Sequence, residues 1–401
     1  MPQVKPEIES FARIKVIGVG GSGRNAVEHM INSKVKGVEF MVVNTDAQDL
    51  HHSSAKKKIH IGKNLTKGLG TGMNPELGKR AVEETKEEVQ EAIKGSDMVF
   101  ITCGLGGGTG SGASPTVAQI AREAGALTVA VVTKPFFFEG QMRGRIAEQA
   151  LDDLRKEVDA VIVIPNDRLL SNISKETTAK NAFIMCDDVL KQAVEGISYL
   201  ITVPGQINVD FADIKAILKD AGSALMGIGV SNGEKRAEEA AKLAINSPLL
   251  DLSVNGARGV LFSVSGGEDI TMFEIQDAAK VITESVDPEA RVIFGTIYDD
   301  TMKKGDLKVT VIASGFPEGV VKKSIFSTGR EEKKDDSDDE DKKDFPRILK
   351  KEAKKEKKEE KQQEKEERKI NTEPKPKDPS DDDDDDDWSA VPAFLRRSKI
   401  K

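Results

Sequence analysis

Short apolar runs alternate with amphipathic segments up to about residue 165 of the chain. The runs have the length of strands, and the segments between them have the three- to four-residue apolar spacing of helices. Strands are predicted at residues 14–19, 39–44, 98–102, 127–133 and 160–165, and helices at 26–32, 75–94, 115–123 and 143–157. This alternation is typical of a parallel sheet covered by helices. We therefore expect a Rossmann-like α/β domain that binds its ligand at the carboxyl ends of the strands.

A longer helical pattern follows at residues 177–203. Val189, Ile197 and Leu200 have core-like spacing in it, and a Pro-Gly pair ends it. Further elements are predicted at residues 213–226, 233–245, 259–265, 273–283, 291–298 and 307–314. We expect a long central helix that leads to a smaller, mixed α/β C-terminal domain.

The composition changes abruptly in the C-terminal segment. Residues 318–387 are rich in Lys, Glu and Asp and end in seven consecutive aspartates. Such a sequence cannot bury a core, so it predicts a disordered charged linker. Residues 388–401 then place Trp388, Phe394 and Leu395 beside two arginines. Clustered apolar anchors on a tether are typical of a partner-binding peptide.

Composition narrows the function classes. The chain has 401 residues and a net charge of −8, without a basic patch, which argues against nucleic acid as a partner. Cys103 and Cys186 have no metal-ligand spacing and are expected to be buried and free. No apolar run has the length of a membrane span. We expect a cytoplasmic protein without direct membrane insertion, divided at residues 1–12 (flexible N-terminus), 13–176 (nucleotide domain), 177–203 (central helix), 204–317 (C-terminal domain), 318–387 (linker) and 388–401 (peptide).

The most informative motif is the glycine loop from Gly104 to Gly112. It lies between a predicted strand and a predicted helix, where free backbone N–H groups and the helix dipole favour an anion. Glycine is needed because a Cβ would block the approach of the backbone to phosphate oxygens. Thr109 and Ser111 add hydroxyl groups. This loop predicts a phosphate site.

A second loop, Gly18 to Gly23, satisfies GxGxxG, and Asp46 follows about twenty residues later. This is the dinucleotide fingerprint, in which the acid holds a ribose hydroxyl, so it favours a NAD-dependent oxidoreductase. Two further glycine-rich loops, Gly104 to Gly112 and Gly68 to Gly72, argue instead for a triphosphate that is held from several sides. No GxxxxGK[ST] P-loop occurs in the sequence.

Gly104 to Gly112 resembles the signature glycine loop of the tubulin/FtsZ GTPases, and nearly the whole chain is similar to the bacterial cell-division members of that family. Supporting stretches, in chain order, are Val42 to Asp46, Thr133 to Phe136, Phe138 to Arg143, Asn208 to Asp213 and Pro392 to Leu395.

The resemblance implies a set of contacts to GTP. Contacts to the phosphates would come from Gly20, Gly21, Ser22, Gly23, Arg24, Asn25, Gly70, Thr71, Gly72, Gly104, Gly107, Gly108, Thr109 and Gly110. Thr71 stands where alanine is more usual in the family. Glu139 and Arg143 would bind the ribose, although their i,i+4 spacing also suits a helix salt bridge. Asn166 and Asp187 would bind the edge of guanine, with Phe183 stacked on it.

The same resemblance implies that Asp210 and Asp213, with Asn208, are catalytic. Their loop would enter the nucleotide pocket of the adjacent subunit and polarise the attacking water beside Mg²⁺. Acids at this position also suit the start of a helix. Because the two contacting surfaces differ, subunits would join head to tail into filaments. No metal-ligating side chain is predicted.

The implied function is GTP-dependent polymerisation of a cell-division ring at mid-cell, with GTP hydrolysed to GDP and phosphate at the interfaces between subunits. Membrane-tethering division proteins and regulators would bind Trp388 to Lys401. Two alternatives stay open. One is the NAD-dependent oxidoreductase, and the other is a tubulin-like scaffold that binds GTP without hydrolysing it.

Overall fold

A computed structural model describes residues 12–170, 176–203, 207, 209–247, 254–299 and 302–316 of the chain. The first half contains β1 (Ile14–Val19), α1 (Gly20–Asn32), β2 (Glu39–Asn44), α2 (Ala47–His51), β3 (Lys57–His60), α3 (Lys63–Thr66), α4 (Pro75–Glu84), α5 (Lys86–Ile93), β4 (Met98–Gly104), α6 (Thr109–Glu123), β5 (Leu127–Lys134), the 3-10 turn η1 (Phe137–Glu139), α7 (Gln141–Glu157), β6 (Ala160–Pro165) and α8 (Asn166–Leu170). The second half contains α9 (Ala179–Thr202), α10 (Phe211–Leu218), β7 (Gly222–Asn232), α11 (Arg236–Ile245), β8 (Gly259–Gly266), α12 (Met272–Thr283), β9 (Arg291–Tyr298) and β10 (Asp306–Ser314).

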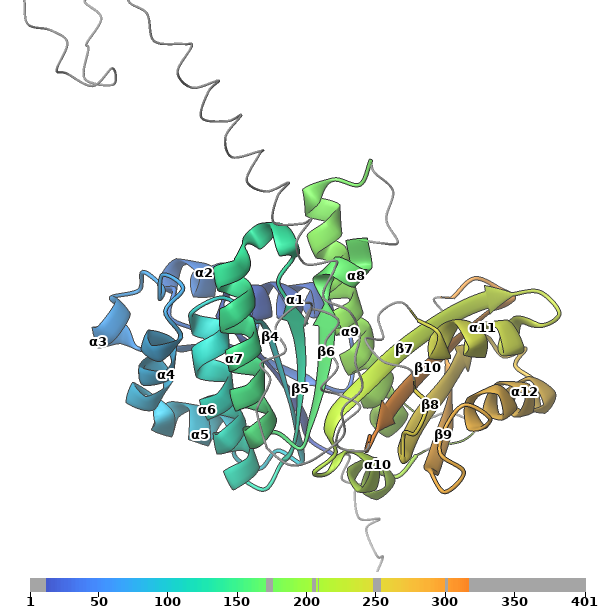
Figure 1. Ribbon diagram of the computed structural model, residues 1–401. Coiled ribbons are helices and arrows are strands. Elements are labelled where there is room, and N and C mark those ends of the chain that lie inside the picture. The colour runs from blue at the N-terminus through green and yellow to red at the C-terminus, as the bar shows by residue number, and fades with distance from the viewer. Residues whose placement is uncertain are drawn as a thin grey trace, which may run out of the picture. The chain divides into compact units, whose positions relative to one another are not determined.

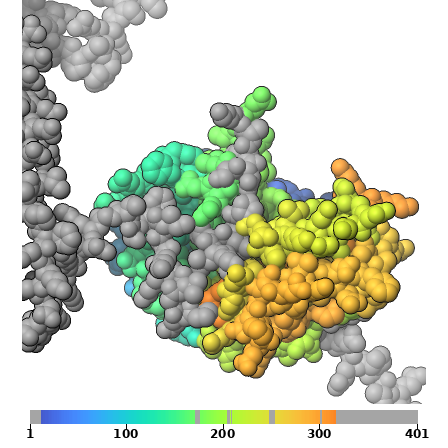
Figure 2. Space-filling view, turned by 45° about the vertical axis from the view of Figure 1, so that its right-hand side comes forward, coloured from blue at the N-terminus to red at the C-terminus, as the bar shows by residue number. Residues whose placement is uncertain are grey.

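All these strands belong to one sheet, in the order β3-β2-β1-β4-β5-β6-β7-β10-β8-β9 (Figure 1). Strands β1 to β6 are parallel. Strand β7 joins the two halves, because Gly222 to Ala224 pair with β6 in parallel and the rest of β7 pairs with β10 in antiparallel. The smaller α/β unit expected from the sequence therefore continues the first sheet. Figure 2 shows the part of the chain from β7 onward, yellow to orange, beside the green and cyan elements that precede it.

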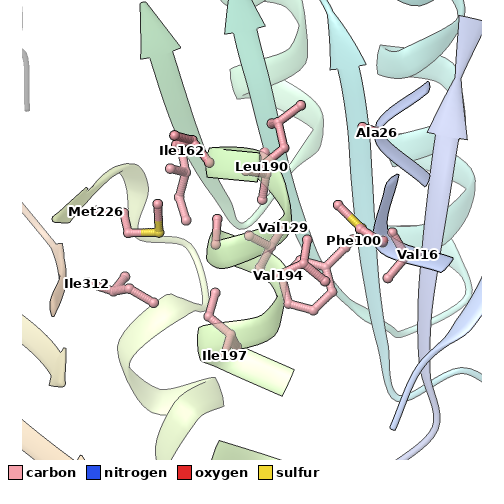
Figure 3. Close-up of a cluster of buried hydrophobic side chains, with 14 of the residues drawn as sticks. Val16, Ala26, Phe100, Val129, Ile162, Leu190, Val194, Ile197, Met226 and Ile312 are labelled. Carbon is pink, nitrogen blue, oxygen red and sulfur yellow. The ribbon is translucent and has the colours of Figure 1, made fainter. Parts of the chain in front are cut away.

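Helix α9 packs on one face of the sheet. Its side chains Leu190, Val194 and Ile197 are almost completely buried. They contact side chains from strands on both sides of β6, so that this core extends from the parallel strands to β7 and β10 (Figure 3). The other labelled members of the cluster are Val16, Ala26, Phe100, Val129, Ile162, Met226 and Ile312. A separate core lies under α4 to α7, so helices cover both faces as predicted.

The predicted strands of the first half are confirmed, but several helix boundaries were wrong. Helices α1 and α6 begin earlier than predicted, inside the glycine loops. A Cβ at Gly112 would collide with the carbonyl oxygen of Pro75. This close contact between α4 and α6 holds the glycine run in a helical conformation that its propensity disfavours. The predicted helix at 75–94 is two helices, since Thr85 has non-helical angles (φ −118°, ψ 24°).

Candidate functional site

Two helix N-termini meet at the carboxyl edge of the sheet. Helix α1 follows β1 directly, and α6 begins five residues after the neighbouring strand β4. The two loops touch, since a Cβ at Gly20 would lie 2.9 Å from the backbone nitrogen of Gly110. The predicted phosphate contacts from Gly20 to Asn25 and from Gly104 to Gly110 are thus brought together. Free N–H groups and two helix dipoles at one place favour an anion.

The third glycine-rich loop, Gly68 to Gly72, lies against the Gly104 to Gly112 loop, because a Cβ at Gly108 would collide with the hydroxyl oxygen of Thr71. Gly70 and Gly72 have positive φ angles of 78° and 56°, which favour glycine. A Cβ at Gly70, Gly72 or Gly107 would meet no atom within 4 Å. Open space therefore remains beside these backbones, as a phosphate chain requires.

Hydroxyl groups connect the loops. Thr109 Oγ1 lies 2.7 Å from Thr45 Oγ1 and 3.2 Å from Thr71 Oγ1. Ser22 Oγ accepts a hydrogen bond from Gly104 N (2.7 Å), which links α1 to the β4 loop. Ser111 Oγ accepts one from Gly106 N (2.9 Å). These bonds fix the loops relative to one another without a ligand.

Charged side chains lie beside the Gly18 to Gly23 loop. Arg24 donates to Asn25 Oδ1 (3.0 Å), and its Nε lies 3.6 Å from Asp49 Oδ1. Burial raises the pKa of Asp49, while the Arg24 guanidinium opposes that rise. Asp46 accepts from Asp49 N (3.0 Å) and caps α2, so one of its oxygens has a structural role. Sequence reasoning missed Thr45 and Asp49, although Thr45 lies in a stretch that carried the resemblance.

Glu139 and Arg143 form the i,i+4 salt bridge that was the alternative interpretation, with 2.7 Å between Oε2 and Nη1. Glu139 Oε1 also accepts from Phe136 N (3.0 Å) and so shapes the turn before α7. The pair borders the phosphate loop, because a Cβ at Gly106 would lie 2.9 Å from the carbonyl oxygen of Arg143. This position is compatible with the proposed contact to ribose.

The three side chains expected to hold guanine come from β6–α8 and α9. Asn166 is 6% exposed, and its Oδ1 is buried without a hydrogen-bond partner in the described part of the chain. Phe183 is 46% exposed and packs edge-on against Phe136, with ring centroids 5.3 Å apart. Burial raises the pKa of Asp187 to about 6, against a small opposing effect of His29. An unpartnered acceptor, an exposed ring face and a desolvated carboxyl group fit a base that carries N–H donors.

The predicted catalytic acids lie away from the glycine loops of their own chain. Asp210 caps α10 by accepting from Ala212 N (2.8 Å), and Asp213 is exposed in the first turn of that helix. Arg122 in the last turn of α6 pairs with Asp220, just beyond α10 (2.8 Å). Since α6 begins at the phosphate loop and has 15 residues, its length of about 20 Å separates that loop from the neighbourhood of α10. Asn208 lies outside the described residues.

Two family models match this chain. Residues 13–174 match the tubulin/FtsZ family GTPase domain, and residues 222–317 match the FtsZ family C-terminal domain. The chain belongs to the FtsZ family. It carries a GTPase domain, which favours GTP over the nicotinamide cofactor of the alternative interpretation.

Solved structures lead to the same family. An empty FtsZ dimer from M. jannaschii is 45% identical, covers 77% of this chain and 89% of its own, and has a TM-score of 0.74. A mutant FtsZ from M. jannaschii, also 45% identical, covers 76% and 92%, with a TM-score of 0.74. GDP-bound CetZ1 from Haloferax volcanii shares the fold at 22% identity, covering 76% and 95%, with a TM-score of 0.66. In the described part of this chain, no helix is long and apolar enough to span a membrane.

Guanine nucleotide affinity is expected to depend on the ionisation of Asp187. Guanine presents N1–H and 2-amino donors, which an ionised carboxylate accepts and a protonated one opposes. With a pKa of about 6 in the free protein, the affinity for GDP should fall below pH 6, by up to about tenfold per pH unit. Calorimetric titration of GDP between pH 5 and 8 measures this.

The matched variant is Asp187→Asn, which keeps the shape but does not titrate. Its affinity for GDP should be weaker at pH 7.5 and lack the additional fall below pH 6. Titration of the phosphates affects both proteins equally, so identical pH profiles would contradict the role of Asp187.

Proposed function

We propose that this chain polymerises head to tail when it binds GTP, and that each nucleotide is hydrolysed to GDP and phosphate by acids of the adjacent subunit. The observation that carries the proposal is the separation of Asp210 and Asp213 from the nucleotide loops of their own chain. Figure 1 shows α10 at one edge of the parallel strands and α1, α2 and α8 at the other.

The topology explains this separation. Helix α9 begins near the guanine pocket and has 24 residues, a length of about 36 Å. It therefore carries the chain from the carboxyl edge of the sheet back to the amino edge. There Gly222 N, at the start of β7, bonds to Asp159 O, just before β6 (2.9 Å). Helix α10 precedes β7 and lies at this amino edge. The same chain thus holds the nucleotide at one end and presents the acids at the other.

Hydrolysis of GTP requires both the glycine loops at one end of the subunit and the acids at the other. Backbone N–H groups of the three loops hold the phosphates, and Asp210 and Asp213 of the next subunit position and polarise the attacking water. The described residues contain no cluster of three His, Cys, Asp or Glu side chains that would hold a metal ion. Mg²⁺ is usually bound through one or two carboxylates and the phosphates of the substrate. When bound, Mg²⁺ neutralises developing charge on those phosphates.

Exposed apolar side chains lie next to residues of the proposed nucleotide site. Leu69, on the Gly68 to Gly72 loop, is 86% exposed, and Phe137 and Phe138, in η1 with Glu139, are 77% and 68% exposed. Large exposed apolar side chains are typical of protein interfaces. A contact between this surface and the α10 end of another copy is heterologous and does not close, so it generates a filament. The similar M. jannaschii protein is described as an FtsZ dimer, which also supports self-association.

Mixing two inactive variants tests the shared site. Asp213→Asn keeps its nucleotide loops but loses the acid. Gly107→Asp keeps the acid but places a carboxylate where the phosphates bind, and the open space around Gly107 accommodates the added side chain. Each variant alone should lose most GTP turnover. Their mixture should regain part of it, because a Gly107→Asp subunit supplies Asp213 to the nucleotide held by an Asp213→Asn neighbour. Phosphate release measures the effect.

Gly107→Asn is the control for size, since it lacks the charge that repels phosphate. If the mixture shows only the sum of the two separate rates, the acids act within one chain and the proposal is wrong. If wild-type protein binds GTP but never releases phosphate, the scaffold alternative is correct.

The C-terminal peptide extends the proposal beyond the described residues. Trp388, Phe394 and Leu395 form an apolar recognition motif at the end of a charged segment about 70 residues long. We propose that membrane-tethering division proteins and regulators bind this motif, so that filaments of a cytoplasmic protein gather as a ring at mid-cell. A linker of this length keeps the filament attached while it lies away from the membrane.

Removal of Trp388 to Lys401 should abolish the ring but leave GTP turnover unchanged, because the peptide lies outside the GTPase domain. Fluorescence microscopy of the tagged chain and phosphate release from the purified protein measure the two effects. Ser398→Ala is a control within the same peptide. A normal ring without the peptide would contradict the assignment.

A further inference from the structure

One surface of the chain carries lysines without acids among them. Residues 50–75 contain five lysines and three of the four histidines of the chain, and no aspartate or glutamate. All five lysines are exposed, and together they are called the lysine surface: Lys56, Lys57, Lys58, Lys63 and Lys67. The chain thus has a basic patch that its net charge of −8 conceals, but this patch contains no Phe, Tyr or Trp to stack on nucleic-acid bases.

Neighbouring side chains do not pair with these lysines. Within the described residues, the ion pairs that lysines form involve other lysines of the chain. The carboxylates next to the lysine surface accept hydrogen bonds from uncharged groups, Glu28 from Ser54 and Glu84 from Asn64. A positive field therefore remains at this edge of the chain.

Protection of a sheet edge explains only part of the lysine surface. Strand β3 is an edge strand of the sheet, and lysines on edge strands prevent pairing with another sheet. Lys57 and Lys58 belong to β3, whereas Lys56, Lys63 and Lys67 lie outside it. The lysines beyond the strand need another explanation.

The lysine surface adjoins the phosphate loops. Lys67 is followed directly by the loop from Gly68 to Gly72. Lys58 Nζ donates to the carbonyl oxygen of His51, the last residue of α2 (3.4 Å). Helix α2 begins three residues after β2 and so lies at the carboxyl edge of the sheet. An anion that approaches the phosphate loops from this side therefore passes the lysines.

We propose that the lysine surface attracts the phosphates of an incoming guanine nucleotide and speeds its association, without contacting the bound nucleotide. The inference rests on the proposed function and adds to it a control of nucleotide loading by ionic strength. A chain with a net charge of −8 repels a nucleotide, and a local field of opposite sign offsets this repulsion during the approach. Salt shortens the range of the field from about 30 Å at 0.01 M to about 3 Å at 1 M.

A variant of the full chain with Lys56→Gln, Lys57→Gln and Lys58→Gln tests the attraction, since glutamine keeps much of the side-chain length and removes the charge. Stopped-flow fluorescence measures the association and dissociation rates of labelled GDP, which avoids assembly driven by GTP. The association rate should fall about tenfold in about 0.01 M salt and equal that of the wild type in about 1 M salt. The dissociation rate should not change.

A second variant, Lys63→Gln with Lys67→Gln, leaves β3 intact and should slow association in the same way. It separates the field from any protection of the edge strand.

The matched control removes three lysines from α12 and from the segment before β10, at the other end of the strand order. Its substitutions are Lys280→Gln, Lys303→Gln and Lys304→Gln, and it should keep the association rate of the wild type. An equal loss in this control, or an unchanged association rate in both test variants, would overturn the proposal. So would a loss of affinity caused by faster dissociation, since the lysines would then be direct contacts. If the wild-type chain does not bind GDP, the proposed function fails instead.

Discussion

The structure depends on the close approach of backbones at the carboxyl edge of the sheet. Gly20 and Gly110 bring the starts of α1 and α6 together, and Gly112 lets the carbonyl of Pro75 approach α6. Side chains at these positions would separate the helices. Because the helices are held this close, two dipoles and the free N–H groups of two loops act on one small volume. The phosphate site is therefore built before a ligand arrives.

Helix α9 imposes the second constraint. Its apolar face belongs to the core that joins the parallel strands to β7 and β10, so its length sets the distance between the proposed guanine site and α10. A rigid helix buried along one face cannot bend to bring Asp213 to the nucleotide of the same chain. Under the proposed function a second copy supplies the acid, so that assembly and hydrolysis become one process.

Local patterns predicted much of this fold. Apolar runs located the strands of the first half, and the glycine loops were assigned to a phosphate site from their place between strands and helices. Features that arise from contacts distant in sequence were not predicted. Helix α6 begins at Thr109 because α4 packs on its glycines, β7 merges two expected domains into one sheet, and Thr45 meets Thr71 only through Thr109.

The central claim is that two subunits complete one catalytic site, and the concentration dependence of GTP turnover tests it most directly. Phosphate release with Mg²⁺ is measured over a wide range of protein concentration. The account predicts almost no turnover below a threshold and a steep rise above it, as subunits associate. Turnover strictly proportional to protein concentration, from the most dilute sample upward, would place catalysis within a single chain and contradict the account.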